Sequence, residues 1–576
     1  MLSYVAVFGG DVLKRYGKIA VRVFLDNCRK RSGIAVLLSC AVSVAWADAG
    51  MRAVVCDPLE WLYPDSRIED VRTLECVDVP SNGVAEANIL FNGLDAKEPL
   101  SFSCDVKGGE WFRLVAVAVE KNTGPNGFTE NREKGVTNRY VTRVAPFKVY
   151  DALEPMEGRR ELTPDGETVA LRLRLRRFPR GGTLPVRMQF RHGMCATNLM
   201  FAVNVHGVAL PPVGRNSFRY TNWMNWYGAM RCHGVRSYWQ DQHFETIRKY
   251  MRLAAYGRQN VIPVPMFVKK DAATGRQILD EARCVRFVGM AQEEGFAYFE
   301  GPHLCRFGDG GWSGKTFVVR TGTNSIVTTT AEGAAQLGRM AAELAAIVER
   351  NGWRDIWLQH VADEPSRNNE TEYRITAGIV RKYMPGLRLI DAIESPNLAG
   401  ALDVYCPKNF LYERESAAYG KLRTRPGDEI WCYTCLTPGG KWMNRLLDQE
   451  VLRALYLPWG CFVHSLDGYL HWGFNRYEPG RTPFDPGFNG TGPAGDRHLV
   501  YPGPDGPWPS VRFEAMRQGV EDCELLRMLK RRDASGAAAL AARLVRGFED
   551  YTADVCEYRT VRRELLRKLS GERDMK

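Results

Sequence analysis

The chain has 576 residues, of which 45% are hydrophobic and 25% are charged, a balance that excludes a disordered or collagen-like protein. This length is enough for two or three domains, one of which can be as large as a complete barrel. Nearly half of the net charge of +11 lies in residues 1–47, which hold seven Lys/Arg and two Asp/Glu, so the remaining residues carry only +6. A field this weak argues against nucleic acid as a partner.

The N-terminal residues have the pattern of a secretory signal. Residues 29–31 are basic, residues 34–45 are apolar, and Ala45 and Ala47 are the small residues required before a cleavage site. The apolar run is shorter than the ~20 residues needed to cross a bilayer, and no later segment is long enough. We therefore expect export to the periplasm, cell surface or medium, with cleavage after Ala47 and no integral membrane segment. Lipoprotein processing at Cys40 is an alternative that the preceding residues match poorly, and the length of the leader suggests that translation begins nearer residues 29–31.

The cysteines do not form a metal-binding pattern. Thirteen of the fifteen follow the leader and are scattered singly, apart from Cys432 and Cys435. A structural zinc site takes four ligands, and the chain has no second C-x-x-C pair. We expect no metal and no cofactor, with most cysteines acting as small core residues. Their odd number leaves the disulfide pattern open.

Residues 51–210 contain short runs in which apolar and polar residues alternate, separated by Gly, Asn, Asp and Pro. A period of two predicts strands, and their spacing favours a β-sandwich, which we place at residues 48–215. In one run, residues 171–178, Leu alternates with Arg. This pattern predicts a strand whose arginines face solvent, rather than a phosphate-binding stripe.

Residues 216–505 alternate short apolar strands with amphipathic segments of helical length, which indicates repeated βα units. Eight candidate strands fit a single (β/α)8 barrel of the TIM type, and they begin at residues 218, 261, 296, 356, 387, 402, 429 and 468. The stretch 304–330 is longer than a barrel loop needs and predicts a lid or a small hairpin. Residues 506–576 have helical periodicity, with charges expected on a solvated outer face. The predicted fold class is a multidomain α+β protein with an N-terminal β-sandwich, a central barrel and C-terminal helices packed on the barrel.

Two adjacent carboxylates follow the fourth predicted strand of the barrel. Asp363 and Glu364 stand directly before Pro365. In barrels of this type the chemistry takes place at the carboxyl ends of the strands. Two neighbouring carboxylates in a partly desolvated site have separated pKa values, so that one is an anion while the other is an acid. The alternative is a helix N-terminus, where acidic residues compensate the macrodipole.

The barrel region resembles glycoside hydrolase family 123, whose characterised members are exo-acting β-N-acetylgalactosaminidases. The resemblance covers most of residues 216–530 and rests on Asn-Trp-Met-Asn-Trp at 222–226, Asp-Glu-Pro at 363–365, and the segments 430–435, 468–475, 501–503 and 512–526. It implies an exported, retaining glycosidase that removes terminal β-N-acetylgalactosamine from glycolipid or glycoprotein oligosaccharides.

The resemblance also implies substrate-assisted catalysis, an exception to the usual scheme of two catalytic carboxylates. The acetamido oxygen of the sugar attacks the anomeric carbon and forms an oxazoline. Asp363 stays charged and orients the acetamido group, while Glu364, held neutral by burial and by the nearby anion, protonates the leaving oxygen and later activates water. Two alternatives remain open: another 2-acetamido sugar, or a carbohydrate-binding or scaffold protein in which the pair is inert.

Aromatic and amide side chains at the other strand ends are predicted to bind the sugar. Indole faces stack on the apolar face of a galacto-configured ring, and Asn, His and Tyr groups bond its hydroxyls. The predicted residues are Trp223, Trp226, His360, Tyr405, Asn409, Trp431, Tyr433, His471, Trp472 and Asn475. Each aromatic taken singly has the barrel core as its alternative, as does His360. The sequence makes no prediction of oligomeric state.

Overall fold

The computed structural model describes residues 50–178, 181–308, 310–321, 324–478 and 480–571. The predicted signal segment, residues 1–47, lies outside these ranges, so its cleavage after Ala47 stays a prediction. None of the helices in the described ranges has the length and apolarity needed to span a membrane.

The N-terminal region is built from two five-stranded sheets, with strand orders β1-β3-β8-β5-β6 and β2-β10-β9-β4-β7. Side chains from both sheets share one hydrophobic core, in which Phe190 of one sheet contacts Phe91 and Trp111 of the other. The strands are β1 (Arg52–Cys56), β2 (Cys76–Pro80), β3 (Val84–Asn92), β4 (Leu100–Cys104), β5 (Glu110–Val119), β6 (Phe147–Pro155), β7 (Glu161–Leu162), β8 (Val169–Arg176), β9 (Gly182–His192) and β10 (Cys195–His206).

Two of the three arginines of β8 are buried, so the prediction that they face solvent was wrong for Arg172 and Arg174, whereas Arg176 is exposed. Arg172 is 1% exposed and Arg174 is 3% exposed. Arg174 pairs with Glu86 on β3 at 3.1 Å and with Glu514 in the C-terminal part of the chain. The alternation predicted the strand, but it could not show that the polar face of the strand meets another charged element.

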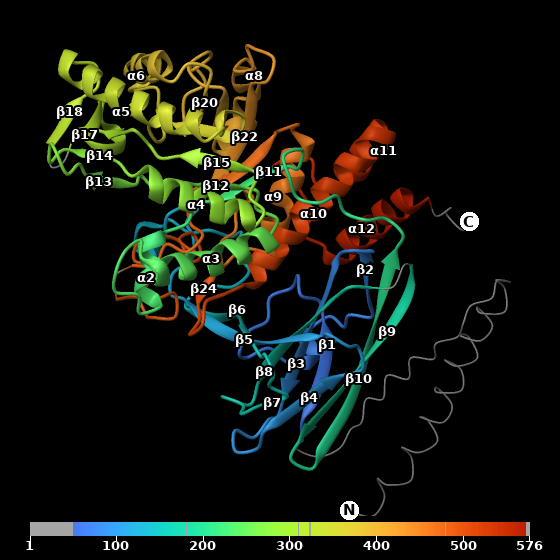
Figure 1. Cartoon of the computed structure of the whole chain (residues 1–576). Coiled ribbons are helices and arrows are strands. Elements are labelled where there is room, and N and C mark those ends of the chain that lie inside the picture. Colours follow the sequence, from blue (N-terminus) through green and yellow to red (C-terminus); the bar gives the residue numbers. More distant parts are fainter. Residues whose placement is uncertain (1–49, 179–180, 309, 322–323, 479, 572–576) are drawn as a thin grey trace, which may run out of the picture. The chain divides into compact units, whose positions relative to one another are not determined.

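Eight parallel strands form a nearly closed barrel in the order β11-β23-β22-β21-β20-β19-β15-β12, and each overlaps a predicted strand (Figure 1). The two end strands are bridged where the backbone amide of Asn260 donates to the carbonyl of Tyr220 at 3.2 Å. The strands are β11 (Arg219–Asn222), β12 (Val261–Pro263), β15 (Tyr298–Gly301), β19 (Trp357–His360), β20 (Arg388–Ile393), β21 (Val404–Pro407), β22 (Glu429–Thr434) and β23 (Gly468–His471).

Helices connect the barrel strands, and α5 shows why these segments fold as they do. The Thr330 side chain caps its first turn by accepting from the Gly333 amide at 3.1 Å. Apolar residues such as Leu337 and Leu344 are buried, and the chain leaves the helix at Gly352, whose φ of 67° suits glycine. The helices are α2 (Trp226–Cys232), α3 (Asp241–Tyr256), α4 (Glu281–Glu293), α5 (Ala331–Arg350), α6 (Glu370–Tyr383), α7 (Asn409–Arg414), α8 (Ser416–Gly420) and α9 (Val451–Val463).

Two small antiparallel sheets extend from the barrel. The stretch predicted to be a lid or a hairpin forms three strands, β16 (Cys305–Phe307), β17 (Phe317–Thr321) and β18 (Asn324–Val327). The hairpin of β13 (Val268–Lys270) and β14 (Gln277–Leu279) follows β12. Because the three-stranded insertion leaves the barrel after β15, it begins at the carboxyl end of the barrel strands.

The C-terminal part consists of a short hairpin and three helices: β24 (Tyr501–Pro502), β25 (Pro507–Trp508), α10 (Val511–Arg532), α11 (Ala534–Ala542) and α12 (Val555–Ser570). Helix α10 packs closely on α9, since a Cβ at Gly519 would lie 2.1 Å from the Leu455 carbonyl oxygen. Its charges were expected on a solvated face, and most of them are buried. Arg512 pairs with Asp151 of β6 at 2.9 Å, and each side chain is 1% exposed or less.

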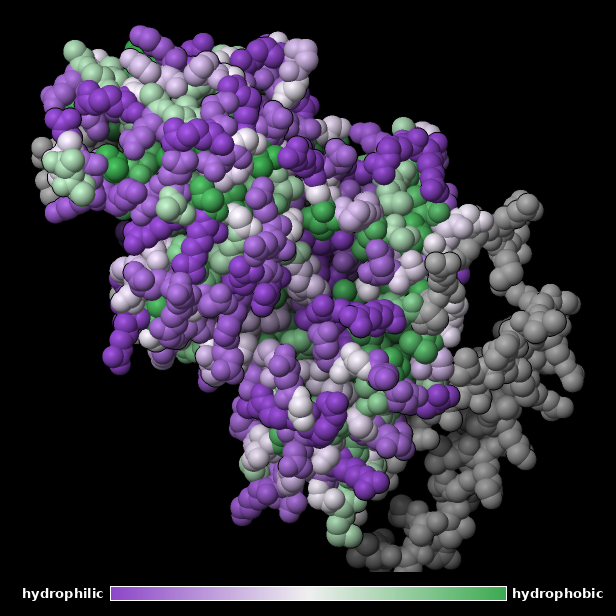
Figure 2. All heavy atoms as spheres, in the orientation of Figure 1, coloured by the Kyte–Doolittle hydropathy of each residue, from purple (hydrophilic) through white to green (hydrophobic). Residues whose placement is uncertain are grey.

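Polar residues cover most of the visible surface of the described ranges. Figure 2 shows hydrophilic side chains over both the barrel and the N-terminal sheets, with hydrophobic ones in small separate groups. The buried charges of α10 and β8 therefore stand out from an otherwise ordinary arrangement of charged side chains at the surface.

Replacing Asp151 should destabilise the whole described unit. Asp151→Asn leaves the Arg512 guanidinium buried without its anion, and breaking such a pair costs roughly 3–5 kcal/mol of unfolding free energy. Denaturant unfolding measures the loss. As a matched control, Asp65→Asn removes the partner of Arg143 from a pair whose carboxylate is 63% exposed, and it should cost less than about 1 kcal/mol. Equal losses of unfolding free energy in the two variants would contradict a stabilising role for the buried pair of Asp151 and Arg512.

Candidate active site

The two carboxylates lie at the carboxyl end of the barrel. Asp363 and Glu364 follow the last residue of β19, His360, and both are partly buried. The next helix, α6, begins only at Glu370. The pair therefore does not cap a helix, and the alternative reading of these acids is wrong.

Asp391 of β20 fixes the backbone just before the pair. Its Oδ2 accepts from the amides of Val361 at 3.1 Å and Ala362 at 2.9 Å, and it also accepts from the hydroxyl of Tyr373 on α6. A carboxylate that binds two successive amides restricts the direction of the following residue. Asp391 thereby fixes the position of the backbone that leads into Asp363.

Glu364 occupies a backbone conformation that side chains rarely adopt. Its φ is 44°, in the left-handed region, which costs a non-glycine residue about 1–2 kcal/mol. The turn is held on its far side by the Pro365 carbonyl, which accepts from the amides of Glu394 at 2.9 Å and Ser395 at 3.2 Å. Strain of this kind persists where the surrounding structure enforces it, and it is concentrated at functional sites.

The buried side chain of His360, three residues before Asp363, bonds carboxylates on both neighbouring strands. His360 Nδ1 lies 2.8 Å from Asp391, and its Nε2 lies 2.9 Å from Glu300 of β15. Burial opposes a charge on the ring, but the two carboxylates outweigh it and raise the pKa of His360 to about 10. Glu300 also accepts from the indole of Trp223 at 2.8 Å. The histidine is thus an imidazolium that joins three strand ends.

The same cluster could be considered as a metal site, because ligand atoms of His303, His360 and Asp391 lie within 4.8 Å of one another. Both nitrogens of His360 already bond carboxylates, however, so this ring has no lone pair to offer. His303 stacks on His360 with ring centroids 4.3 Å apart, and burial together with the neighbouring charge lowers the pKa of His303 well below its usual value. This donor set suits a shared proton better than a cation.

Asp363 does not have the electrostatics predicted for it. Burial, the charge of Glu364 and that of Asp391 raise its pKa to about 7, although His360 and Lys408 act in the opposite direction. The family resemblance predicted that Asp363 stays charged. In the free site it is instead a group that titrates near neutral pH, because it is desolvated and has two acidic neighbours.

Three donors surround the carboxylate of Glu364. The indole of Trp312 donates to Oε2, the hydroxyl of Tyr433 donates to Oε1, and the Lys408 ammonium lies 3.4 Å from Oε1. Burial and the nearby Glu364 raise the pKa of Tyr433 well above its usual value, so that its hydroxyl remains a donor. Lys408 is shared with Glu394, which divides its charge between two carboxylates.

Four predicted substrate-binding residues, Trp223, His360, Tyr433 and Trp472, lie at or near this network. Trp223 contacts His360 edge-on at 5.4 Å between centroids, and Tyr433 bonds Glu364. Trp472 follows β23, donates to Asp496 at 2.9 Å and carries the Arg476 guanidinium over its ring. Trp223 and Trp472 are half-buried, so part of each ring remains accessible.

Three predicted aromatic residues belong to the core instead. Trp226 lies on α2 and packs on Phe287 at 5.2 Å. Trp431 precedes Tyr433 by two residues on the same face of β22, and it is completely buried deeper in the barrel. Tyr405 is also fully buried and donates to the Leu402 carbonyl at 2.8 Å.

The three remaining predicted residues hold loops in place. Asn409 donates to the Met443 carbonyl at 3.0 Å, and Asn475 accepts from the Asn225 amide at 2.7 Å. His471 is the last residue of β23, and its Nδ1 lies 2.6 Å from the guanidinium of Arg445. Asn409 and Asn475 are buried and use their amides within the protein, whereas the buried Nε2 of His471 has no hydrogen-bond partner among the described residues.

Five residues around the pair were not predicted from the sequence: Glu300, Trp312, Asp391, Lys408 and Glu394. Glu300 and Asp391 had a usable signal, since a carboxylate within an apolar barrel strand must have a buried partner. Lys408 directly follows β21, and a charged residue at the carboxyl end of a barrel strand is a candidate site residue. Trp312 lies in the long insertion after β15, and no local pattern relates it to residue 364.

Comparison with known proteins identifies the family of the chain. The model of the glycoside hydrolase 123 catalytic domain matches residues 223–529, which include both carboxylates and more than half of the chain. The chain belongs to glycoside hydrolase family 123. A glycosidase function follows from this membership, and the barrel places Asp363 and Glu364 where such enzymes carry their chemistry.

A solved family 123 glycoside hydrolase from Clostridium perfringens, described for glycolipid glycan hydrolysis, has a similar fold. It shares 11% identity with this glycoside hydrolase at a TM-score of 0.66, over 90% of this chain and 97% of its own. A family 5 mannosidase from Rhizomucor miehei is 13% identical at a TM-score of 0.33, over 59% and 96% of the two chains. A β-galactosidase from Marinomonas ef1 is 9% identical at 0.33, over 57% and 61%. No curated protein matches the sequence.

Asp391 should act as a positioning residue in this glycoside hydrolase. Asp391→Asn keeps the shape of the side chain but removes one of the two anions at His360, and displacing the turn by about 1 Å should lower kcat about 100-fold with little change in KM. NMR titration should show the His360 pKa falling from about 10. Tyr373→Phe removes a donor but keeps the charge, and it should cost less than tenfold. A folded Asp391→Asn variant with normal kcat would contradict the role.

Proposed function

We propose that the chain is an exported, retaining exo-glycosidase that hydrolyses terminal β-N-acetylgalactosaminides by substrate-assisted catalysis. The observation that carries the proposal is the adjacent pair of carboxylates, Asp363 and Glu364, beyond the carboxyl end of β19 within the family match. An adjacent pair suits a substrate that supplies its own nucleophile, because the usual two-carboxylate scheme places the groups on opposite sides of the bond.

The neighbouring carboxylates support this division of labour. Glu300 and Asp391 are completely buried, and each accepts hydrogen bonds from several donors, so neither can reach a sugar. Glu394 is ion-paired with Lys408. The proposed nucleophile is the 2-acetamido oxygen of the substrate, as the resemblance to the family implies.

In the first step, this oxygen attacks the anomeric carbon while the bond to the leaving oxygen breaks. Glu364 transfers its proton to the leaving oxygen, and a cyclic oxazolinium forms. The Asp363 carboxylate accepts from the acetamido N–H, and this interaction strengthens as positive charge develops on the ring. In the second step, Glu364 removes a proton from water, which attacks the same carbon and reopens the ring. Two inversions give retention.

The contacts of Glu364 fit both of its roles. Once it has lost its proton, the hydroxyl of Tyr433 and the indole of Trp312 donate to the carboxylate, one to each oxygen. These donors stabilise the anion produced in the transition state, where stabilisation raises kcat. Lys408 contributes less than a full charge because Glu394 shares it.

Indole rings are the proposed sugar-binding surfaces. The accessible parts of Trp223 and Trp472 can stack on the apolar face of the terminal ring. Trp312 is 62% exposed and bonds the proposed acid, so it lies on the side of the leaving group. The relative described for glycolipid glycan hydrolysis favours oligosaccharide substrates of this kind, and the predicted signal sequence favours action outside the cytoplasm.

Removing either carboxylate should abolish most of the activity. Asp363→Asn and Glu364→Gln should each lower kcat/KM for nitrophenyl β-N-acetylgalactosaminide roughly 10²–10⁴-fold while circular dichroism stays unchanged. Asp241→Asn, at a side chain that is 90% exposed, is the control. The corresponding β-N-acetylglucosaminide tests the alternative sugar, and a preference for it would replace the proposed specificity. Efficient hydrolysis of a 2-hydroxy galactoside would contradict the substrate-assisted step.

The pH dependence follows from Asp363. Its carboxyl is protonated below a pKa of about 7 and ionised above it, and the mechanism requires the ionised form. The kcat/KM of the free enzyme should therefore rise as Asp363 ionises, with a midpoint near pH 7, and should fall at higher pH where Glu364 loses the proton that it must donate. A profile that is flat from pH 5 to pH 8 would show that Asp363 does not titrate in the free enzyme or is not needed as an anion.

A further inference from the structure

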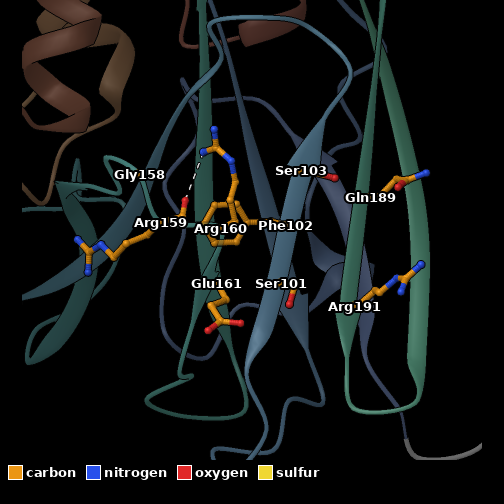
Figure 3. Close-up of a pocket in the computed structure, with 9 residues that line it drawn as sticks. All are labelled: Ser101, Phe102, Ser103, Gly158, Arg159, Arg160, Glu161, Gln189 and Arg191. Carbon is orange, nitrogen blue, oxygen red and sulfur yellow. Dashed lines mark hydrogen bonds between the residues drawn. The ribbon is translucent and has the colours of Figure 1, made fainter.

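A hollow lies on the N-terminal sheets, and neither Asp363 nor Glu364 lines it. It has a volume of about 760 Å³, within the range of pockets that hold small ligands. Strand β4 forms its floor. Figure 3 shows the segment with Arg159 and Arg160 on one side of this strand, and Gln189 and Arg191 of β9 on the other.

Strand register makes the floor of the hollow polar. In the antiparallel pair of β4 and β9, Ser101 lies opposite Arg191 and Ser103 lies opposite Gln189, so these four side chains share one face of the sheet. Phe102 lies between the two serines and points into the core, where it is 2% exposed. The hollow is thus lined by hydroxyl, amide and guanidinium groups, without an exposed aromatic ring.

The charges of the hollow are unbalanced. Its lining holds three arginines and one carboxylate, that of Glu161. Arg159 bonds Glu154 at 3.1 Å. Within the described ranges, neither Arg160 nor Arg191 forms an ion pair. Arg160 donates to the Arg159 carbonyl at 3.3 Å. Guanidinium groups that have no carboxylate partner are suited to bind a carboxylate or a sulfate through two parallel hydrogen bonds.

We propose that this hollow binds an anionic oligosaccharide, a sugar chain that carries carboxylate or sulfate groups. The arginines bind the anionic groups, while Ser101, Ser103 and Gln189 bond sugar hydroxyls. A neutral sugar is a poor fit because no aromatic face is available for stacking. The choice of a sugar as carrier of the anion rests on the proposed glycosidase function, and the site itself is separate from the catalytic pair.

Isothermal titration calorimetry on the full chain tests the proposal. A heparin tetrasaccharide supplies sulfate groups and a tetragalacturonate supplies carboxylates alone, while maltotetraose is the neutral counterpart. We expect at least one acidic ligand to bind, at least tenfold more tightly than maltotetraose. The double variant Arg160→Gln/Arg191→Gln should weaken that binding about tenfold or more. Arg276→Gln, at an exposed arginine of the β13–β14 hairpin, should leave it unchanged.

Three results would overturn the proposal: neither acidic tetrasaccharide binds, maltotetraose binds equally well, or the double variant binds as the wild type does. Inorganic sulfate competing at the same concentration as the tetrasaccharide would also overturn it, since the site would then recognise an ion and not a sugar. Hydrolysis of the nitrophenyl substrate is measured in the same samples and should be equal in wild type and double variant. Loss of the hydrolytic function would therefore be distinguishable from loss of this site.

Discussion

The buried positive charge of His360 is the interaction on which the active site depends. An imidazolium in the interior is stable only beside compensating anions, and here they come from β15 on one side and β20 on the other. The same carboxylate that holds one ring nitrogen also binds the amides that lead into the catalytic turn. Charge, strand ends and turn therefore form one hydrogen-bonded network, in which each part fixes the position of the next.

Two acids of almost identical chemistry acquire different properties from their surroundings. Asp363 faces burial and two like charges, which favour its protonated form near neutrality. Glu364 is held in a strained backbone conformation and receives donors from an indole, a phenol and an ammonium group. These donors come from three separate parts of the barrel, so the environment of this carboxylate is a property of the closed fold and not of the local sequence.

The sequence predicted the periodic features well and the side-chain contacts less well. Eight strands and the position of the carboxylate pair follow from hydrophobic patterns and a short motif. The alternation of side chains along β22 also indicates that Trp431, two residues before Tyr433, lies on the same face as Tyr433 but deeper in the barrel. Asn409 and Asn475 illustrate the real limit, because whether an amide bonds a ligand or a loop depends on backbone atoms far away in sequence. The ion pairs of β8 depend on distant partners in the same way.

The salt-bridged helix α10 has a consequence for how the protein can be divided. Glu514 and Arg517 lie within the family match, yet Glu514 pairs with Arg174 and Arg517 lies 3.4 Å from Glu86, both in the N-terminal sheets. A truncated chain that began at the first barrel strand would expose these charges and lose their counterions. The glycosidase domain defined by sequence similarity is therefore smaller than the unit that these ion pairs hold together. A barrel expressed alone lacks the N-terminal side chains that neutralise the buried charges of α10.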